Sequence, residues 1–221
     1  MATLLPLDPD QLLSTTRSVR KRLDLVTPVD LAVIRECIDV ATQAPTGGNN
    51  QGWHWLIVTD KEKMRPIAEW YRDAFKAFYG NRDAVLGNLD QADGAYEDTT
   101  RKVIDSADYQ ADHLGEVPVW VIACIEGRTD GAPAVWQASQ WGSLLPAVWS
   151  FMLAARERGL GTAWTTLHMP NGGEQKAADL LGIPFDKYSQ AGLFPIAYTI
   201  GTDFKPAKRL PLDPIVHWDT W

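Results

Sequence analysis

A helical pattern of apolar positions begins shortly after residue 27. The apolar side chains that recur at helical spacing, and so share one face, are Leu31, Ile34, Ile38 and Ala41. Thr27 offers a capping hydroxyl, Pro28 is favoured at the first helical position, and Asp30 suits the positive end of the helix dipole. Since a proline disfavours helical geometry in the residue before it, this helix is expected to end before Pro45.

Four short runs rich in β-branched, aromatic and other apolar residues predict strands. They cover residues 53–59, 117–125, 161–166 and 193–200. The second run, VPVWVIACI, is apolar without interruption, as expected of a strand that is covered on both faces. Helical segments separate these runs, so the pattern predicts a sheet flanked by helices.

Three further helices are predicted among these strands. The first covers residues 64–79, and the second is a long, largely apolar helix over residues 138–158 that ends before a glycine, as helices commonly do. Pro146 requires a kink or a break in the second. The third ends at Leu181. The broad apolar surface of the long helix suggests a central position or a subunit interface.

Two segments depart from this alternation. Residues 80–115 mix glycine, asparagine and aspartate with short helical signals, and we interpret them as a variable cover segment. Residues 201–221 are polar, proline-rich and basic, then aromatic, which is typical of an arm that packs on something other than its own sheet. The whole chain, residues 1–221, is expected to form one domain.

Composition and charge narrow the classes of function. Hydrophobic residues make up 45% and charged residues 22% of the 221 residues, as in ordinary folded proteins. The net charge of −7 argues against nucleic-acid binding, which requires a basic face. The longest apolar run has about half of the roughly 20 residues that a membrane helix needs, so we expect no membrane association.

Neither the cysteines nor the histidines indicate a metal site. Cys37 and Cys124 lack the spacing of a zinc site or a disulfide framework, so both are expected in the core of a cytoplasmic protein. The four histidines show no metal-ligand spacing, and a structural role is favoured for each. The sequence also lacks a nucleophile elbow, a Walker loop and a catalytic cysteine signature. An enzyme built on this chain would therefore need a cofactor for the difficult chemistry.

Two basic clusters carry the residue types that bind phosphate. Arg17, Ser18 and Arg20 lie within four residues and offer two cations and a hydroxyl donor. Lys208 and Arg209, near the other end of the chain, are candidates for the same site. The alternative is that these charges are simply solvated, as most basic runs are.

The segment APTGGNNQ, which follows the first long helix, is a candidate ligand-facing loop. Its glycines allow a ligand to approach the backbone closely, and its amides offer donors and acceptors. The alternative is a tight connector in which the asparagines cap turns.

The segment GLGTAWTT contains a Gly-x-Gly pattern, but it follows a helix and precedes a strand. This order is the reverse of the dinucleotide-binding fingerprint, so a Rossmann site is rejected. Thr165 and Thr166, at the end of the predicted strand, are instead candidates to present donors and hydroxyls to a planar ligand.

Taken together, these motifs resemble the FMN-dependent nitroreductase-like flavoproteins. The matching segments are TRSVRKR, ATQAPTGGNNQGWHWLIVTD, MLAARERGLGTAWTT, LLGIP and the basic KR followed by LPL, in the order of the family and over residues 16–212. The resemblance implies an α+β fold with a mixed β-sheet flanked by helices. It also implies an intertwined homodimer that exchanges its C-terminal arms and binds two FMN molecules at the interface.

The resemblance assigns roles to the cofactor-binding candidates. Arg17, Ser18 and Arg20 match the motif that holds the flavin phosphate and pyrimidine edge, and Lys208 with Arg209 matches the basic pair near the C-terminus. Arg20 is the expected electrostatic support for reduced flavin, with no side chain acting as a catalytic acid or base.

The resemblance further implies that part of each flavin site comes from the other subunit. The segment expected to reach the neighbouring flavin contains Pro45, Thr46, Gly47 and Asn49. The positions expected beside the reactive edge of the flavin are Thr165, Thr166 and Leu167. The sequence departs from the family at Gly52, where proline is usual, and at Ser150, where many members have asparagine.

The expected activity is electron transfer from NADH or NADPH, through FMN, to a small planar acceptor such as a nitroaromatic or a quinone, by a ping-pong mechanism. The alternatives are a flavin-sequestering protein with little turnover and a dehalogenase or flavin-cleaving relative. Aromatic residues of the middle segment are candidates to line the acceptor site, although core packing is favoured for most of them: Tyr71, Phe75, Phe78, Tyr79, Tyr96 and Tyr109.

Overall fold

A four-stranded sheet lies at the centre of the chain, with the strand order β1-β2-β4-β3. The computed structural model describes residues 3–80, 94–209 and 211–221. The strands are β1 (Trp53–Val58), β2 (Val119–Glu126), β3 (Leu160–Thr162) and β4 (Tyr188–Tyr198). Neighbouring strands all pair antiparallel. Within the described residues, the parallel pairing of the expected mixed sheet is limited to isolated bridges, such as that of Ser18 with Thr162.

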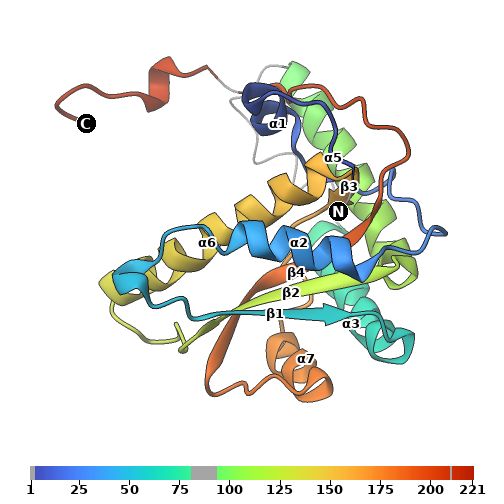
Figure 1. Cartoon of the computed structure of the whole chain (residues 1–221), viewed down its shortest axis with the longest axis vertical. Helices are drawn as coiled ribbons and strands as arrows, with labels where there is room; N and C mark the ends of the chain where they lie inside the picture. The colour runs from blue at the N-terminus through green and yellow to red at the C-terminus, as the bar shows by residue number, and fades with distance from the viewer. Residues whose placement is uncertain (1–2, 81–93, 210) are drawn as a thin grey trace.

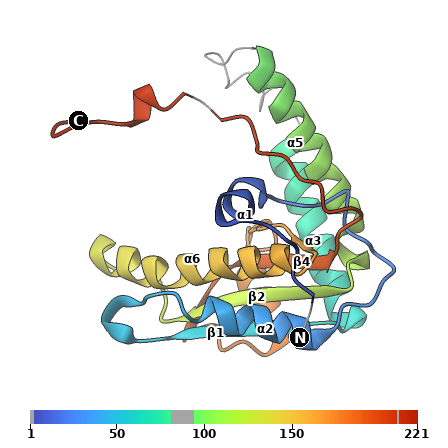
Figure 2. The ribbon, with the colours of Figure 1, turned by 45° about the horizontal axis from the view of Figure 1, so that its top comes forward.

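Helices cover both faces of this sheet (Figures 1 and 2). One face packs against α2 (Leu31–Ala41) and α6 (Ala134–Glu157). The other face packs against α3 (Lys61–Tyr79), α5 (Gly94–His113) and α7 (Gly173–Leu181). A short helix, α1 (Pro9–Thr15), contacts α6. The chain is therefore α+β, as the sequence predicts.

Strand β2 shows why its sequence is apolar without interruption. Val121 and Ala123 belong to the core cluster that contains α2 and α6. Trp120 and Ile122, which alternate with them, belong to the cluster on the opposite face. Successive side chains of a strand point to opposite faces, so both sets are buried. The expected burial on two faces is confirmed.

The first long helix begins later than the sequence suggests. Asp30, rather than Thr27, is the N-cap of α2, and its carboxylate accepts a hydrogen bond from Ala32 N–H over 2.9 Å. The Thr27 hydroxyl instead donates to the Asp24 carboxylate over 2.6 Å. The predicted start was wrong because Asp24 binds the Thr27 hydroxyl, and because Asp30 caps a helix as well as a threonine does.

The long helix α6 is continuous, and the predicted alternative of a break at Pro146 is wrong. The proline removes one backbone hydrogen bond from the helix. The apolar side chains on either side of the proline are fully buried, and their burial favours a continuous helix. These residues are Leu144, Ala147, Val148 and Phe151. None of the helices in the described part of the chain is long and apolar enough to cross a membrane.

The two irregular segments differ in structure. Residues 81–93 of the expected cover segment lie outside the described residues, and the following stretch forms α5. After β4 the chain runs back along the body to about Lys205, and its last residues extend away from the rest of the molecule (Figures 1 and 2). Trp218 and Trp221 on this arm are 84% and 102% exposed. The arm thus leaves its own sheet, as the sequence predicts.

Candidate functional site

The N-terminal segment with the predicted phosphate-binding residues lies beside strand β3. Ser18 forms a parallel bridge with Thr162, and Val19 N–H donates a hydrogen bond to Thr162 O over 2.8 Å. Val19 and Leu23 are buried, whereas Arg17 and Ser18 are exposed. The edge of the sheet therefore fixes this segment with its polar side chains accessible.

The same segment lines a cavity of about 290 Å³, which we call the basic cavity. Its walls are residues 17–22, Ser106 and residues 203–205. Five of these residues are cationic, and the single carboxylate, Asp203, already forms an ion pair with Arg22 at 2.7 Å. This arrangement suits a bound anion such as a phosphate group.

A cation that sequence reasoning did not select joins the basic cavity from the C-terminal segment. Lys205 lines the cavity, and its carbonyl oxygen accepts a hydrogen bond from Arg17 Nη1 over 3.2 Å. Lys208 and Arg209 lie further along the arm, are exposed, and do not line the cavity. The structure thus brings Arg17, Ser18 and Arg20 together with Lys205 rather than with the predicted basic pair.

Arg20 occupies the inner wall of the basic cavity. Its Nη1 donates a hydrogen bond to Ser106 Oγ over 3.4 Å, and its buried Nε has no hydrogen-bond partner among the described residues. Burial lowers the pKa of the Arg20 guanidinium below its ordinary value, while Tyr71 and Tyr79 act in the opposite direction. A buried donor without a partner is costly, so this atom is suited to bind a ligand acceptor.

A polar network lies behind Arg20. Tyr71, which is 2% exposed, accepts hydrogen bonds from Gln110 Nε2 over 3.0 Å and from Thr165 Oγ1 over 3.4 Å. Burial raises the pKa of the Tyr71 hydroxyl, which keeps it protonated. The other polar atom of the Gln110 amide, Oε1, is buried and lacks a partner within the described residues.

Sequence reasoning missed most of this network. It placed Tyr71 among aromatic residues with a favoured core role, and the burial of Tyr71 confirms that role. It did not select Ser106 or Gln110. The one available signal was the polar tip of a tyrosine on an otherwise apolar helix face, because a buried tyrosine hydroxyl usually needs a hydrogen-bond partner.

The predicted strand-end residues connect this network to the sheet. Thr165 exchanges two backbone hydrogen bonds with Leu193, over 3.1 and 2.8 Å, so its backbone groups are already used. Its hydroxyl is used as well, because it contacts Tyr71 and accepts a bond from Leu167 N–H over 3.4 Å. Thr166 is exposed and Leu167 is partly buried. Thr165 thus supports the site, and Thr166 is the accessible one of the pair.

The remaining predicted segment, residues 45–49, lies elsewhere. Gly47 N–H donates a hydrogen bond to Ser143 Oγ, in the first half of α6. The basic cavity is tied to the other end of α6, where Arg156 Nη2 donates to Thr202 O over 2.9 Å. Ser143 and Arg156 are 13 positions apart, which is about 20 Å along a helix. One chain therefore does not bring the two sets of predicted residues together.

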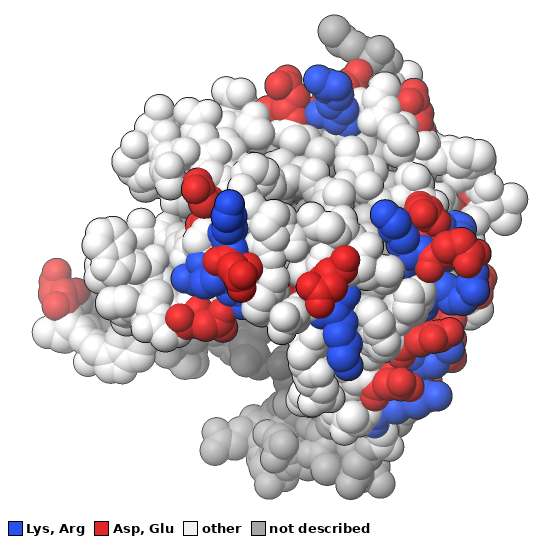
Figure 3. All heavy atoms as spheres, turned by 90° about the horizontal axis from the view of Figure 1, so that it is seen from below, with Lys and Arg blue, Asp and Glu red and all other residues white. Residues whose placement is uncertain are grey.

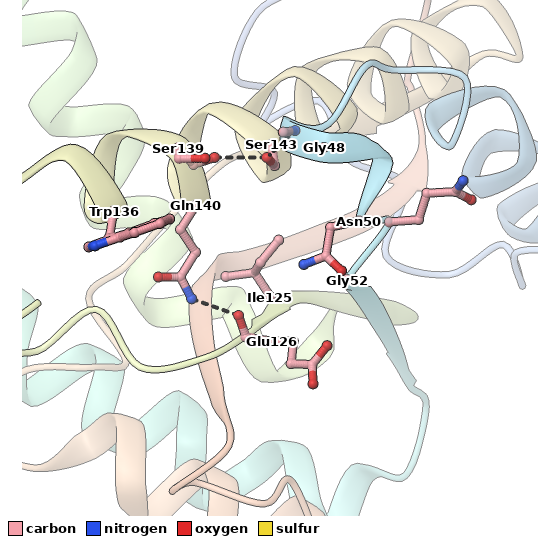
Figure 4. A pocket seen from close by; sticks show the side chains of 11 residues that line it. Gly48, Asn50, Gly52, Ile125, Glu126, Trp136, Ser139, Gln140 and Ser143 are labelled. Atoms are coloured by element: carbon pink, nitrogen blue, oxygen red, sulfur yellow. Dashed lines mark hydrogen bonds between the residues drawn. The ribbon is translucent and has the colours of Figure 1, made fainter.

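A second cavity, of about 430 Å³, lies beside this loop, and we call it the loop cavity. It is bounded by residues of the 47–52 segment, by Ile125 and Glu126 at the end of β2, and by the first turns of α6 (Figure 4). Its side chains are mainly amides, hydroxyls and the ring of Trp136. The larger cavity thus lies away from the cluster of cations, at the opposite end of α6.

Other reactive side chains are buried away from both cavities. Burial lowers the pKa of His168 to about 4, and its Nε2 lies 3.0 Å from Gln190 Oε1. Burial raises the pKa of the Cys37 and Cys124 thiols to about 12. No group of three or more histidine, cysteine, aspartate or glutamate residues suited to a metal occurs within residues 3–80, 94–209 and 211–221.

The surface charge is mixed on the face that Figure 3 presents. Lysine and arginine side chains alternate there with aspartate and glutamate side chains, and no single-sign patch covers the face. A face of this kind does not resemble the continuous basic surface that binds a phosphate backbone.

Comparison with known proteins identifies the family of this chain. The chain belongs to the Nitroreductase family, whose family model matches residues 13–198. A curated protein of Methanothermobacter thermautotrophicus, named as an NADH dehydrogenase/NAD(P)H nitroreductase, is 23% identical over 97% of this chain and 88% of its own length.

Two solved structures have a similar fold. One is oxidized iodotyrosine deiodinase bound to FMN and 3-iodo-L-tyrosine, with a TM-score of 0.66, 23% identity, and coverage of 95% of this chain and 98% of the other. The second is the FMN- and NADPH-dependent nitroreductase NfnB from Sphigopyxis sp. strain HMH, with a TM-score of 0.65, 20% identity, and coverage of 97% and 100%.

Proposed function

We propose that the protein is an FMN-dependent oxidoreductase that transfers electrons from NADH or NADPH to a small planar acceptor, such as a nitroaromatic or a quinone, by a ping-pong mechanism. The observation that carries the proposal is the basic cavity, which ends on a partly buried arginine whose buried Nε atom has no hydrogen-bond partner among the described residues. Membership of the Nitroreductase family supports it.

The residues of the basic cavity suit both the phosphate and the pyrimidine edge of FMN. Arg17, Ser18 and Lys205 offer cations and a hydroxyl to the phosphate. Arg20 Nε is a buried donor on the inner wall of the cavity, so it matches an acceptor on the polar edge of a pyrimidine ring. Lys208 and Arg209 remain candidates for the phosphate, since they follow Lys205 closely.

The chemistry that bound FMN supplies is hydride acceptance from the nicotinamide donor followed by electron transfer to the acceptor. Arg20 stabilises the negative charge that reduction adds to the pyrimidine ring, because it is a fixed cation in a partly buried position. Thr165 anchors its segment through Leu193 and Tyr71, and the neighbouring Thr166 and Leu167 remain candidates for contact with the reactive edge of the flavin. None of these roles requires a side chain to exchange a proton.

We propose that the site is completed by a second copy of the chain. The segment with Pro45, Thr46, Gly47 and Asn49 is anchored to α6 about 20 Å along the helix from Arg156, which ties this helix to the basic cavity of the same chain. Strand β1 is at an edge of the sheet, and an extended arm of a second copy could pair with such an edge. Apolar residues are also exposed on α6, as expected of a helix in a subunit interface: Val135, Trp136, Leu145 and Trp149.

An anaerobic titration of the purified protein with NADH or NADPH tests cofactor and reaction together. The expected result is a flavin absorbance near 450 nm that is lost on titration and recovered when a nitroaromatic or a quinone is added. Bound flavin that neither donor reduces would favour the alternative of a sequestering protein. A protein that binds no FMN would overturn the proposal.

A second candidate function is reductive dehalogenation of a halogenated aromatic compound. It is favoured by the structural likeness to a deiodinase that was solved with 3-iodo-L-tyrosine. Release of iodide from 3-iodo-L-tyrosine by the reduced protein would support it, and turnover of nitroaromatic compounds without halide release would favour the first proposal.

A further inference from the structure

The loop at residues 46–51 holds an unusual backbone conformation. Gly48, Asn49 and Gln51 all have positive φ values, of 59°, 55° and 50°. A residue other than glycine in this region is strained and persists only where the surroundings hold it. Within the loop, Gln51 N–H donates to Thr46 Oγ1 over 3.3 Å and Gln51 Nε2 donates to Asn49 Oδ1 over 3.0 Å.

One residue of helix α6, Ser143, holds both ends of this loop. The Ser143 hydroxyl accepts a hydrogen bond from Gly47 N–H over 2.9 Å and donates to Ser139 O over 2.7 Å. The Ser143 carbonyl accepts a hydrogen bond from Trp53 Nε1 over 2.8 Å, on the far side of the loop. Ser143 is 8% exposed, and Figure 4 shows its bond to Ser139 next to the loop.

The close approach of the loop to α6 depends on a glycine. A Cβ atom added to Gly47 would lie 2.8 Å from Ser139 Oγ and 3.5 Å from Ser143 Oγ. A contact of 2.8 Å is shorter than van der Waals distance, so with a side chain at this position either the exposed Ser139 hydroxyl must rotate away or the loop must move from the helix. The bond of Gly47 with Ser143 therefore requires the serine, and the glycine avoids this collision.

We propose that Ser143 is a positioning residue that acts on the flavin bound by the other subunit. It holds residues 46–49 in the conformation that reaches the basic cavity of the second copy, without touching the FMN bound by its own chain. This inference rests on the proposed function, because it needs FMN in a site shared by two chains. It adds a residue on α6 that sets the geometry of the shared site from a distance.

The first test is the affinity for FMN of two matched serine variants. Ser143→Ala removes the acceptor of the Gly47 bond, and the dissociation constant for FMN is expected to rise about tenfold. Ser139→Ala is the control, since it removes a hydroxyl from the same cavity but keeps the carbonyl to which Ser143 donates. Its affinity is expected to stay within twofold of wild type. Equal affinity of Ser143→Ala and wild type would overturn the proposal.

A second pair of variants moves the loop without changing Ser143. Gly47→Ala is expected to weaken FMN binding because its methyl group meets Ser139 Oγ. The double variant Gly47→Ala/Ser139→Ala removes the nearest colliding atom and should recover part of the affinity. This pair decides the question if Ser143→Ala does not fold, and wild-type FMN affinity in a Gly47→Ala protein whose loop is displaced in its crystal structure would count against the proposal.

A mixed-dimer experiment separates action on the other subunit from a general structural effect. In a heterodimer of Ser143→Ala with Arg20→Ala, a shared site combines the intact Arg20 of one chain with the intact loop of the other, while the second site carries both defects. Up to half of the sites should then bind FMN at wild-type affinity. If Ser143→Ala alone is impaired but no wild-type sites are regained, Ser143 acts within its own chain and the proposal fails. A wild-type protein that binds no FMN would instead refute the proposed function.

Discussion

The Gln110 amide donates a hydrogen bond to Tyr71 Oη over 3.0 Å, behind the wall of the basic cavity. The two residues come from α5 and α3, and the same hydroxyl is contacted by Thr165 from the end of the sheet. Three elements thus meet at one buried phenol group. Because these polar groups are buried, loss of the Tyr71 hydroxyl would leave the Gln110 amide nitrogen without its acceptor.

Replacement of Tyr71 by phenylalanine should therefore destabilise the fold. The change leaves the buried Gln110 amide without its acceptor, and the expected loss in the free energy of unfolding is about 1–3 kcal/mol. Urea denaturation monitored by tryptophan fluorescence measures it. Tyr79→Phe is the matched control on the same helix, because Tyr79 is only partly buried, and its effect should stay within about 0.5 kcal/mol. Equal stability of Tyr71→Phe and wild type would show that the network contributes little.

Replacement of Arg20 by alanine should weaken FMN binding and lower the flavin reduction potential. The Arg20 guanidinium favours reduced flavin because that form carries negative charge. Each tenfold loss of this preference lowers the two-electron reduction potential of the flavin by about 30 mV. A spectroelectrochemical titration measures the potential. Lys63→Ala, which removes an exposed cation from α3, should leave both properties unchanged. An unchanged potential in Arg20→Ala would remove this residue from the site.

Replacement of Arg156 by alanine should loosen the start of the C-terminal arm. Arg156 is 3% exposed, donates to Thr202 O, and its guanidinium carbon lies 4.8 Å from the ring centre of Phe204. The guanidinium carbon of Arg22 lies 4.3 Å from the same ring centre, so two guanidinium groups contact this ring. Limited proteolysis followed by mass spectrometry should show faster cleavage near residues 199–205. Lys176→Ala on α7 serves as the control, and the same cleavage rate in Arg156→Ala and wild type would contradict the prediction.

The stability of the fold should fall in mildly acidic solution because of His168. Burial lowers the pKa of His168 to about 4, whereas in the unfolded chain its pKa is near the ordinary value of 6.5. The unfolded state therefore binds more protons between these values, and stability is lost as the pH falls from about 6.5 to 4. The expected loss from this one group is about 3 kcal/mol across that range.

Urea denaturation at several pH values measures this loss. His168→Gln, which cannot take up the proton, should show a smaller dependence on pH over the same range. His217→Gln, on the exposed arm, should keep the wild-type dependence. An identical dependence in His168→Gln and wild type would assign the acid sensitivity to other groups.

Elements whose signals are local were predicted well. Strand β1 was expected at residues 53–59 and is observed at Trp53–Val58, and α7 ends at Leu181 before Gly182, whose φ of 75° suits a glycine cap. Strand β4 begins at Tyr188, five residues before the predicted start. Its first residues pair with the end of β2, and that pairing has no signal in the local sequence.

Three features could be predicted from the sequence alone: the alternation of strands and helices, the burial of β2 on both faces, and the adjacency of Arg17, Ser18 and Arg20. These features depend on periodicity and on residues close together in the chain. The three-dimensional fold was needed to show that Lys205 rather than Lys208 lines the basic cavity, and that Tyr71, Ser106 and Gln110 lie behind or beside Arg20. It also separated the 45–49 loop from the cavity by the length of half of α6. Such placements depend on the packing of helices on the two faces of one sheet, which brings together residues that are far apart in sequence.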